Sequence, residues 1–170
     1  MPYQPLDRID RALVALLLDD ARMSNKELAA RVGIAPSTCL ERVRALRARG
    51  VITGFHAEVD LDALGRGLEA IVAVRVRPHS RPHVDAFREA AAAMPEVIEV
   101  FHVTGADDFL LHVAVADTDA LRDFVLDRLT MRPEVAHVES RVVYQHTRRP
   151  ALAAQPSERT SRARLSPGPS

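Results

Sequence analysis

The sequence has a single cysteine, no long apolar run and no overall charge, and each shortage excludes a class of protein. One thiol, Cys39, cannot form an internal disulfide framework and is typical of a protein in a reducing compartment. No segment approaches the ~18 uninterrupted apolar residues that a membrane-spanning helix needs. The first residues, MPYQPLDRID, lack the basic-then-apolar order of a secretory signal peptide. We therefore expect a cytoplasmic protein that does not enter a membrane.

The net charge of zero conceals an uneven distribution along the chain. Residues 61–146 carry nine basic and fourteen acidic side chains, whereas residues 147–170 carry five basic and one acidic. Lys26 is the only lysine, so nearly all of the cations are arginine. Because the bulk charge does not indicate a nucleic-acid-binding protein, such a function has to be argued from local geometry.

The first 50 residues have the apolar spacing of three short helices. In the first, apolar residues recur at i, i+4, i+7 and i+8, starting from Ile9. The second begins with a capping box, Ser24 to Glu27, and is predicted to end at Gly33, which can adopt the left-handed conformation. A third helix follows within a few residues and ends at Gly50; its apolar face consists of Cys39, Val43 and Leu46. Three short helices with a tight glycine-containing turn before the last are typical of a helix-turn-helix.

After Gly50 the apolar period becomes alternating. Residues 51–59 (VITGFHAEV) predict a strand, and residues 60–67 (DLDALGRG) predict a hinge. The elements that follow have the order βαββαβ, which is that of a ferredoxin-like sandwich. Their predicted ranges are strand 68–77, helix 82–94, strand 97–103, strand 109–116, helix 118–129 and strand 135–144.

The prediction is therefore an α+β chain with two folded domains. Residues 1–59 form the helix-turn-helix domain with its following strand, 60–67 the hinge, and 68–146 the ferredoxin-like domain. Residues 147–170, rich in proline, serine and arginine, have almost nothing apolar to bury and are predicted to be a disordered basic tail. Strands such as AIVAVRV and LLHVAVA are apolar at nearly every position, which favours burial on both sheet faces. We expect the face without helices to meet another subunit.

Few residues are candidates for catalysis or metal binding. Cys39 lies on the apolar stripe of the third helix, so we interpret it as a buried structural thiol. His79 and His83 are four residues apart, but a proline between them disfavours a metal pair. His102 and His112 lie on neighbouring predicted strands and could approach each other, although two polar positions on a sheet is the simpler interpretation. We assign no catalytic residue, metal site or cofactor.

The third helix is the candidate DNA-binding element. It carries four arginines against one acidic residue, Glu41. Small hydroxyl side chains stand near its N-terminus, the end that meets base edges when a recognition helix enters the major groove. An ordinary surface helix with a solvated basic face is the alternative. The candidate contacts with double-stranded DNA are Ser37, Thr38, Leu40, Glu41, Arg42, Arg44, Arg47 and Arg49, among which Arg42 is expected to be essential.

Two segments together resemble a known family. Residues 6–55, from LDRIDRALVALL to RARGVITGF, resemble the helix-turn-helix of the Lrp/AsnC (leucine-responsive, feast-famine) transcription regulators. The βαββαβ half, with VTGADDFLLHVAV, resembles their effector-binding and oligomerisation domain. The resemblance implies a dimer built through the sheets, often assembled into an octamer, with an amino acid or a similar small molecule as effector.

Two positions depart from the family pattern in the third helix. Members often carry serine before the helix proline and a basic residue just before the arginine that matches Arg42, where this chain has Ala35 and Glu41. Alanine is a poorer N-cap than serine by about 1 kcal/mol. A second frame, Thr38 to Glu41, also fits a capping box and would recruit Glu41 to the backbone.

The resemblance places the effector site in the loop between the second and third strands of the ferredoxin-like domain. The matching residues are Thr104, Gly105, Ala106, Asp107 and Asp108. Successive side chains near strand ends diverge, so we expect one aspartate in the turn, Asp107, and the other, Asp108, in the pocket. A plain hairpin turn without function is the alternative.

Two other functions remain open at this stage. Sirohaem decarboxylases resemble the same two-domain layout, and His102, His112 and Arg75 could then face a tetrapyrrole. An effector sensor that has lost its affinity for DNA is the other, and it stays open because Glu41 places an acidic side chain among the arginines of the third helix. The basic third helix favours a sequence-specific DNA-binding transcriptional regulator.

Overall fold

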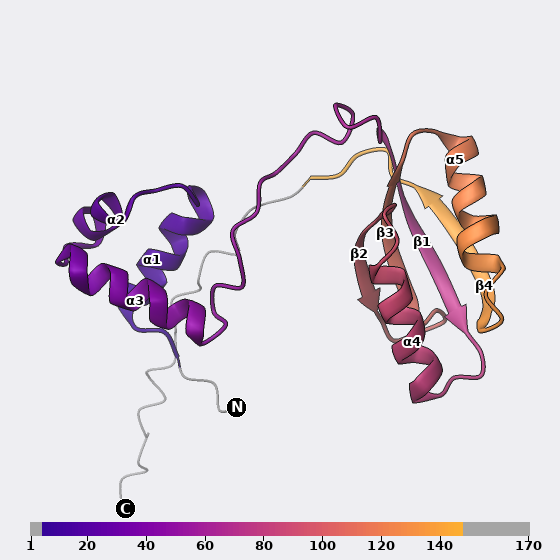
Figure 1. Cartoon of the computed structure of the whole chain (residues 1–170), viewed down its shortest axis with the longest axis horizontal. Helices are drawn as coiled ribbons and strands as arrows, with labels where there is room; N and C mark the ends of the chain where they lie inside the picture. The colour runs from indigo at the N-terminus through magenta and orange to yellow at the C-terminus, as the bar shows by residue number, and fades with distance from the viewer. Residues whose placement is uncertain (1–4, 148–170) are drawn as a thin grey trace, which may run out of the picture. The chain divides into compact units, whose positions relative to one another are not determined.

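A computed structural model describes residues 5–147 of the chain, in two compact units. The first unit runs to His56 and the second spans Ala57–Thr147; Figure 1 draws both. The predicted basic tail lies outside the described residues, apart from its first residue, Thr147. Within residues 5–147, every helix is too short or too polar to cross a lipid bilayer.

The first unit contains the three predicted helices, α1 (Arg8–Asp19), α2 (Asn25–Val32) and α3 (Pro36–Ala48). The capping box of α2 is confirmed: the Glu27 amide donates to the Ser24 hydroxyl, and the Ser24 amide donates 2.9 Å to the Glu27 carboxylate. Gly33 ends α2 with φ 72°, the left-handed conformation that the sequence predicted. The helices enclose a small core made of Leu13, Leu17, Leu28, Ala29, Cys39 and Leu46.

The predicted strand at residues 51–59 is wrong. Residues 53–60 have no regular secondary structure, and Phe55 and Val59 remain half-exposed. An alternating apolar pattern becomes a strand only where a neighbouring strand takes up its backbone N–H and C=O groups. No strand in the described part of the chain pairs with this segment. Within the predicted hinge at 60–67, residues 61–65 form a turn, closed by hydrogen bonds that include the one from the Gly65 amide to the Asp62 carbonyl at 2.9 Å.

The second unit is the predicted ferredoxin-like sandwich. Its strands lie in the order β2-β3-β1-β4, and every neighbouring pair is antiparallel. The helix predicted at residues 118–129 is α-helical only up to Asp123 and continues as a π-helix from Phe124. The elements are β1 (Leu68–Val76), α4 (Arg81–Ala92), β2 (Val97–His102), β3 (Phe109–Val115), α5 (Thr118–Asp123), its π-helical continuation η1 (Phe124–Thr130) and β4 (Val135–Val142).

Both helical segments pack on the same face of this sheet. Alternate residues of the two central strands face the helices, and Phe87 of α4 meets Phe109 of β3 with ring centroids 4.9 Å apart. The opposite face, which includes the partly buried Ile71 and Leu110, is covered by no helix of this unit. One face of the sheet is therefore covered by helices, and the other, which we call the open sheet face, is not.

Candidate functional sites

The exposed face of α3 carries most of the residues that the sequence proposed for DNA binding. Cys39 and Leu46 anchor the helix in the core, which leaves the opposite side in solvent. Burial raises the pKa of the Cys39 thiol, as expected for a structural cysteine. Of the predicted DNA contacts, all but Arg42 are exposed: Ser37, Thr38, Leu40, Glu41, Arg44, Arg47 and Arg49.

The start of α3 decides between the two capping frames. Ala35 occupies the N-cap with φ −66° and ψ 144°, and no side chain caps the helix there. The Thr38 frame is therefore not used, and Thr38 lies inside the first turn. Glu41 makes no side-chain hydrogen bond or ion pair with any other residue that the structure describes. Its carboxylate faces the same solvent as the exposed arginines.

Arg42 makes internal contacts that its predicted role in DNA binding did not include. Its Nη1 donates to the Asp7 carboxylate at 2.6 Å and to the Asp10 carboxylate at 2.8 Å, which ties α3 to the start of α1. Hydrogen bonds from the Asp10 amide and the Arg42 guanidinium hold the pKa of Asp7 below its usual range. Arg49 also points toward this site, with Nη1 3.9 Å from the Asp10 carboxylate. The sequence missed this because the aspartates lie more than thirty positions away.

The two remaining arginines of α3 keep their charge in solvent. Arg44 is exposed, and Arg47 lies 6.0 Å from the centroid of the Phe55 ring. The four arginines of the helix thus divide into a pair directed at the carboxylates of α1 and a pair on the open face. Arg44 can approach a phosphate or a base directly, and Arg47 can do so by leaving the Phe55 ring, without breaking an ion pair with α1.

The loop between β2 and β3 is fixed to β1 by its two aspartates. Asp108 accepts a hydrogen bond from the Val76 amide at 2.7 Å, and its other oxygen lies 2.9 Å from Nδ1 of His79. Asp107 turns the other way, with an oxygen 3.6 Å from the Arg75 guanidinium. Arg75 also donates to the Ala106 carbonyl at 2.7 Å. Asp108 thus stabilises the loop against β1, whether or not it also binds a ligand.

A hollow of about 320 Å³ lies beside this loop. It brings together three of the five predicted effector residues, Thr104, Gly105 and Asp108, whereas Ala106 and Asp107 do not line it. The sequence missed its other walls, which are His79, His102 and Val103. In the sequence, His79 was considered only as one half of a metal pair with His83. The His83 ring lies 2.7 Å from the Ser80 hydroxyl.

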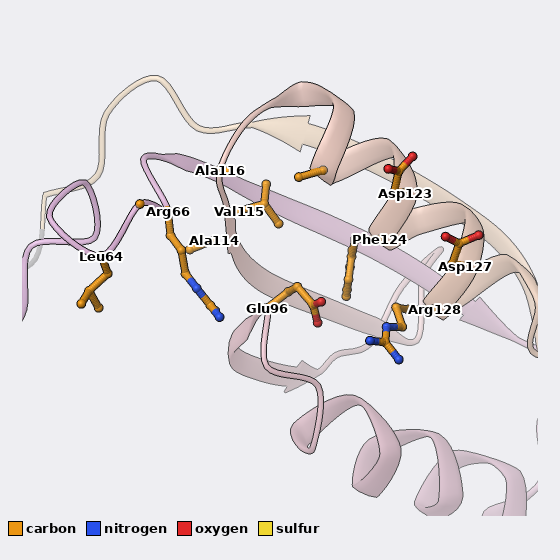
Figure 2. A pocket seen from close by; sticks show the side chains of 12 residues that line it. Leu64, Arg66, Glu96, Ala114, Val115, Ala116, Asp123, Phe124, Asp127 and Arg128 are labelled. Carbon is orange, nitrogen blue, oxygen red and sulfur yellow. The ribbon is translucent and has the colours of Figure 1, made fainter.

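A larger hollow of about 460 Å³ has no counterpart in the sequence prediction (Figure 2). Arg66 from the hinge and Glu96 from the turn before β2 approach it from one side, and Arg128 approaches from η1. Arg66 donates to the Pro95 carbonyl. One carboxylate oxygen of Glu96 is buried without a hydrogen-bond partner among the described residues. The residues that line this hollow are far apart in the sequence, so no local sequence motif predicts it.

His102 and His112 do not approach each other. His102 is opposite Phe109 in the register and stacks on that ring, with centroids 4.9 Å apart. His112 faces away from the helices, and its Nε2 lies 2.6 Å from the Glu69 carboxylate. Side chains alternate between the two faces along a strand. His102 is paired with Phe109, which faces the helices, whereas His112 is three residues beyond Phe109 on β3 and therefore faces the other way.

Comparison with known proteins agrees with this arrangement. A family model described as winged helix-turn-helix DNA-binding matches residues 6–53, and the Lrp/AsnC ligand binding domain matches residues 69–151. The HTH-type transcriptional regulator AldR of Mycolicibacterium smegmatis is 43% identical over 143 residues, covering 84% of each chain. The leucine-responsive regulatory protein of Rhizobium meliloti is 39% identical over 135 residues, covering 79% of this chain and 86% of the relative.

A solved structure extends the agreement to the fold. A transcriptional regulator from Neisseria meningitidis, in complex with L-Met, superposes with a TM-score of 0.78 at 30% identity, covering 85% of this chain and 94% of that one. With its capped helix-turn-helix and its ferredoxin-like second unit, the chain belongs to the Lrp/AsnC family of DNA-binding transcriptional regulators.

Proposed function

We propose that the exposed face of α3 enters the major groove of double-stranded DNA and that Arg44 and Arg47 supply its principal cationic contacts. The observation that supports this is the division of the arginines, since these two extend from a face whose opposite side is locked in the core. Ser37 and Thr38 stand at the N-terminal end, where hydroxyls can reach bases or phosphates. Leu40 and Glu41 lie between the two ends, where Leu40 can meet a thymine methyl and Glu41 a cytosine amino group.

The test compares arginine variants of equal charge change. Arg44→Ala and Arg47→Ala should each weaken operator binding by about 1–3 kcal/mol if the side chain contacts a guanine, or reduce the salt slope by about one if it contacts a phosphate. Arg81→Ala is the control, because it removes an exposed arginine from the other unit. Equal losses for all three variants would show that only bulk charge matters. Normal binding by both α3 variants would overturn the proposed interface.

We propose that the hollow beside the β2–β3 loop binds the effector, a small molecule with the charges of an amino acid. Asp108 offers an anion for an ammonium group, and the backbone around Thr104 and Gly105 offers amides for a carboxylate. The Val76 amide keeps one oxygen of Asp108, so the ligand takes the place of His79 at the other. Ala106 and Asp107 act indirectly by fixing the loop through Arg75. The bound L-Met of the Neisseria relative supports an amino-acid ligand.

The experiment measures operator affinity with and without each member of an amino-acid panel. Thr104→Ala and Asp108→Asn should reduce the effector response at least tenfold while leaving effector-free DNA binding intact; the asparagine still accepts the Val76 hydrogen bond. Asp127→Asn is the matched control, because it removes a charge from the larger hollow. A response lost in the Asp127 variant and kept in the Asp108 variant would move the effector to that larger hollow.

We further propose a regulator that acts in the cytoplasm as a homodimer built through the open sheet faces, and that dimers assemble further, as in the octamers of the family. The relatives are transcriptional regulators, which supports a function other than catalysis. A visible absorbance spectrum of the purified protein tests the decarboxylase alternative, since a bound tetrapyrrole is coloured. A Soret band that copurifies with the chain would contradict the proposal.

A further inference from the structure

Four titratable side chains converge on the sheet face opposite the helices. Glu69 of β1 and His112 of β3 are diagonal neighbours, and Glu99 of β2 is directly opposite His112. His146, in the segment after β4, completes the group. Three donor atoms, one each from Glu69, His112 and His146, lie within 4.8 Å of one another. The cluster lies outside both hollows and outside the helix-turn-helix.

The contacts within the cluster have the pattern of a metal-ligand set. The Glu69 carboxylate lies 2.6 Å from Nε2 of His112 and 3.7 Å from Nδ1 of His146. The second nitrogen of His112 faces the Glu99 carboxylate at 3.9 Å. A histidine that binds a metal through one nitrogen usually donates its other N–H to a carboxylate, which fixes the tautomer and the ring orientation. Glu99 is in place for that positioning role.

The distances require only a small adjustment to accept an ion. Donor atoms bound tetrahedrally at 2.0–2.2 Å lie roughly 3.3–3.6 Å apart, so the 3.7 Å separation must shorten slightly and the 2.6 Å separation must widen. The donor nitrogens of His112 and His146 lie within 4.8 Å of each other and are brought to this spacing by movement of the His146 side chain. His112 is 7% exposed and fixed by its strand, whereas His146 is about half exposed and can move. Two imidazoles and one carboxylate favour zinc and neighbouring transition ions over magnesium or calcium.

We propose that Glu69, His112 and His146 bind one divalent transition-metal ion of the zinc class, with Glu99 orienting the His112 ring. An ordinary histidine–glutamate ion pair explains the 2.6 Å contact, but it does not explain why a second imidazole and a second carboxylate gather around the same ring. The His146 ring meets the His112 ring edge-on, with centroids 5.4 Å apart. This site is independent of the effector and DNA proposals, but it lies on the sheet face that is also proposed as the dimer interface, so the ion would be held beside that interface.

The test is a cobalt titration of the full chain after treatment with a chelator, in the absence of DNA. Co²⁺ bound to nitrogen and oxygen donors absorbs in the visible range, so the expected result is a band that saturates at one ion per chain and is displaced by Zn²⁺. Glu69→Gln and His146→Gln should each weaken binding at least tenfold. His102→Gln is the control, because it removes an imidazole from the opposite face. Glu99→Gln should weaken binding less than either ligand variant.

His146→Gln is the decisive variant, because its exposed side chain can be removed without opening the core. Zn²⁺ should also raise the melting temperature of the wild type and of His102→Gln, but not of His146→Gln. A titration without saturation would overturn the proposal, as would a band that the Glu69 and His146 variants leave unchanged. Neither result depends on DNA affinity, so failure here leaves the regulatory proposal as it was.

Discussion

Arg42 shows how one side chain can serve stability where its sequence position suggests DNA binding. Its guanidinium satisfies two carboxylates of the α1 N-terminus, and one of them, Asp10, is only 8% exposed. Removing the arginine leaves the nearly buried Asp10 carboxylate without its close ion-pair partner, and Arg49 is more distant, at 3.9 Å. A buried charge without a close partner is destabilising. A loss of DNA binding on mutation of Arg42 would therefore not identify a DNA contact by itself.

Arg42→Ala should lower the melting temperature of the helix-turn-helix unit, because the Asp10 carboxylate loses its close partner. Arg44→Ala should leave the melting temperature unchanged, since that side chain is exposed. Thermal denaturation followed by circular dichroism separates the two cases. If Arg42→Ala melts like the wild type yet binds DNA poorly, Arg42 contacts DNA and the original sequence prediction stands.

Asp7 gives the same unit an acid-sensitive contact. The Asp10 amide and the Arg42 guanidinium lower the pKa of Asp7 in the folded state, so folding favours the ionised carboxylate. Its contribution to stability is present above the unfolded pKa, near 4, and is lost as the pH falls through the lower folded value. Asp7→Asn should therefore flatten the loss of stability below about pH 4, measured by urea denaturation.

At the scale of elements, the helix caps differ in quality although their backbones agree. Ser24 and Ala35 hold nearly identical N-cap conformations, with φ −67° and ψ 152° for Ser24 and φ −66° and ψ 144° for Ala35. Only Ser24 offers an oxygen to the first turn. The α3 helix thus begins without the cap that its backbone is already shaped to accept.

Ala35→Ser should stabilise the protein by about 1 kcal/mol, because the new hydroxyl can accept a backbone N–H of the first turn without rearrangement. Ser24→Ala should cost a similar amount by removing the α2 cap. Urea denaturation of both variants measures the pair of effects. A neutral Ala35→Ser result alongside a destabilised Ser24→Ala would mean that the α3 N-terminus is already satisfied by water.

The predictability of the elements follows from how local their causes are. The Ser24 capping box, Gly33 and the βαββαβ order were predictable because short-range spacing determines them. Residues 51–59 were not, because a strand depends on a distant partner. The switch from α5 to η1 at Asp123 also has no signal in the apolar period.

The candidate sites divide in the same way. The exposed face of α3 follows from helical periodicity and could be predicted. The partners of Arg42, the walls of the larger hollow and the cluster around His112 could not, because each joins residues that are distant in sequence. Parity along a strand would have separated His102 from His112, but only once the register of β2 against β3 was known.

At the scale of the whole molecule, the open sheet face of the second unit exposes apolar side chains to solvent. Phe101 lies directly opposite Leu110, which places both side chains on the face that the helices leave uncovered. Phe101 is 45% exposed and Leu110 only partly buried, so the middle of this face has apolar area that a second copy could bury. In a two-fold interface each such residue acts twice.

Phe101→Arg should shift the protein toward monomers, because the variant removes two apolar contacts per dimer and adds two charges. A fully buried phenylalanine contributes about 1.5–3 kcal/mol, and Phe101 has about half of its surface left to bury, so the dissociation constant should rise at least ~10-fold. Light scattering after size exclusion, over a range of concentrations, gives the mass. Leu126→Arg is the matched control, since Leu126 is 50% exposed on η1. If the Leu126 variant dissociates and the Phe101 variant does not, the helical side forms the interface and the open sheet face has another occupant.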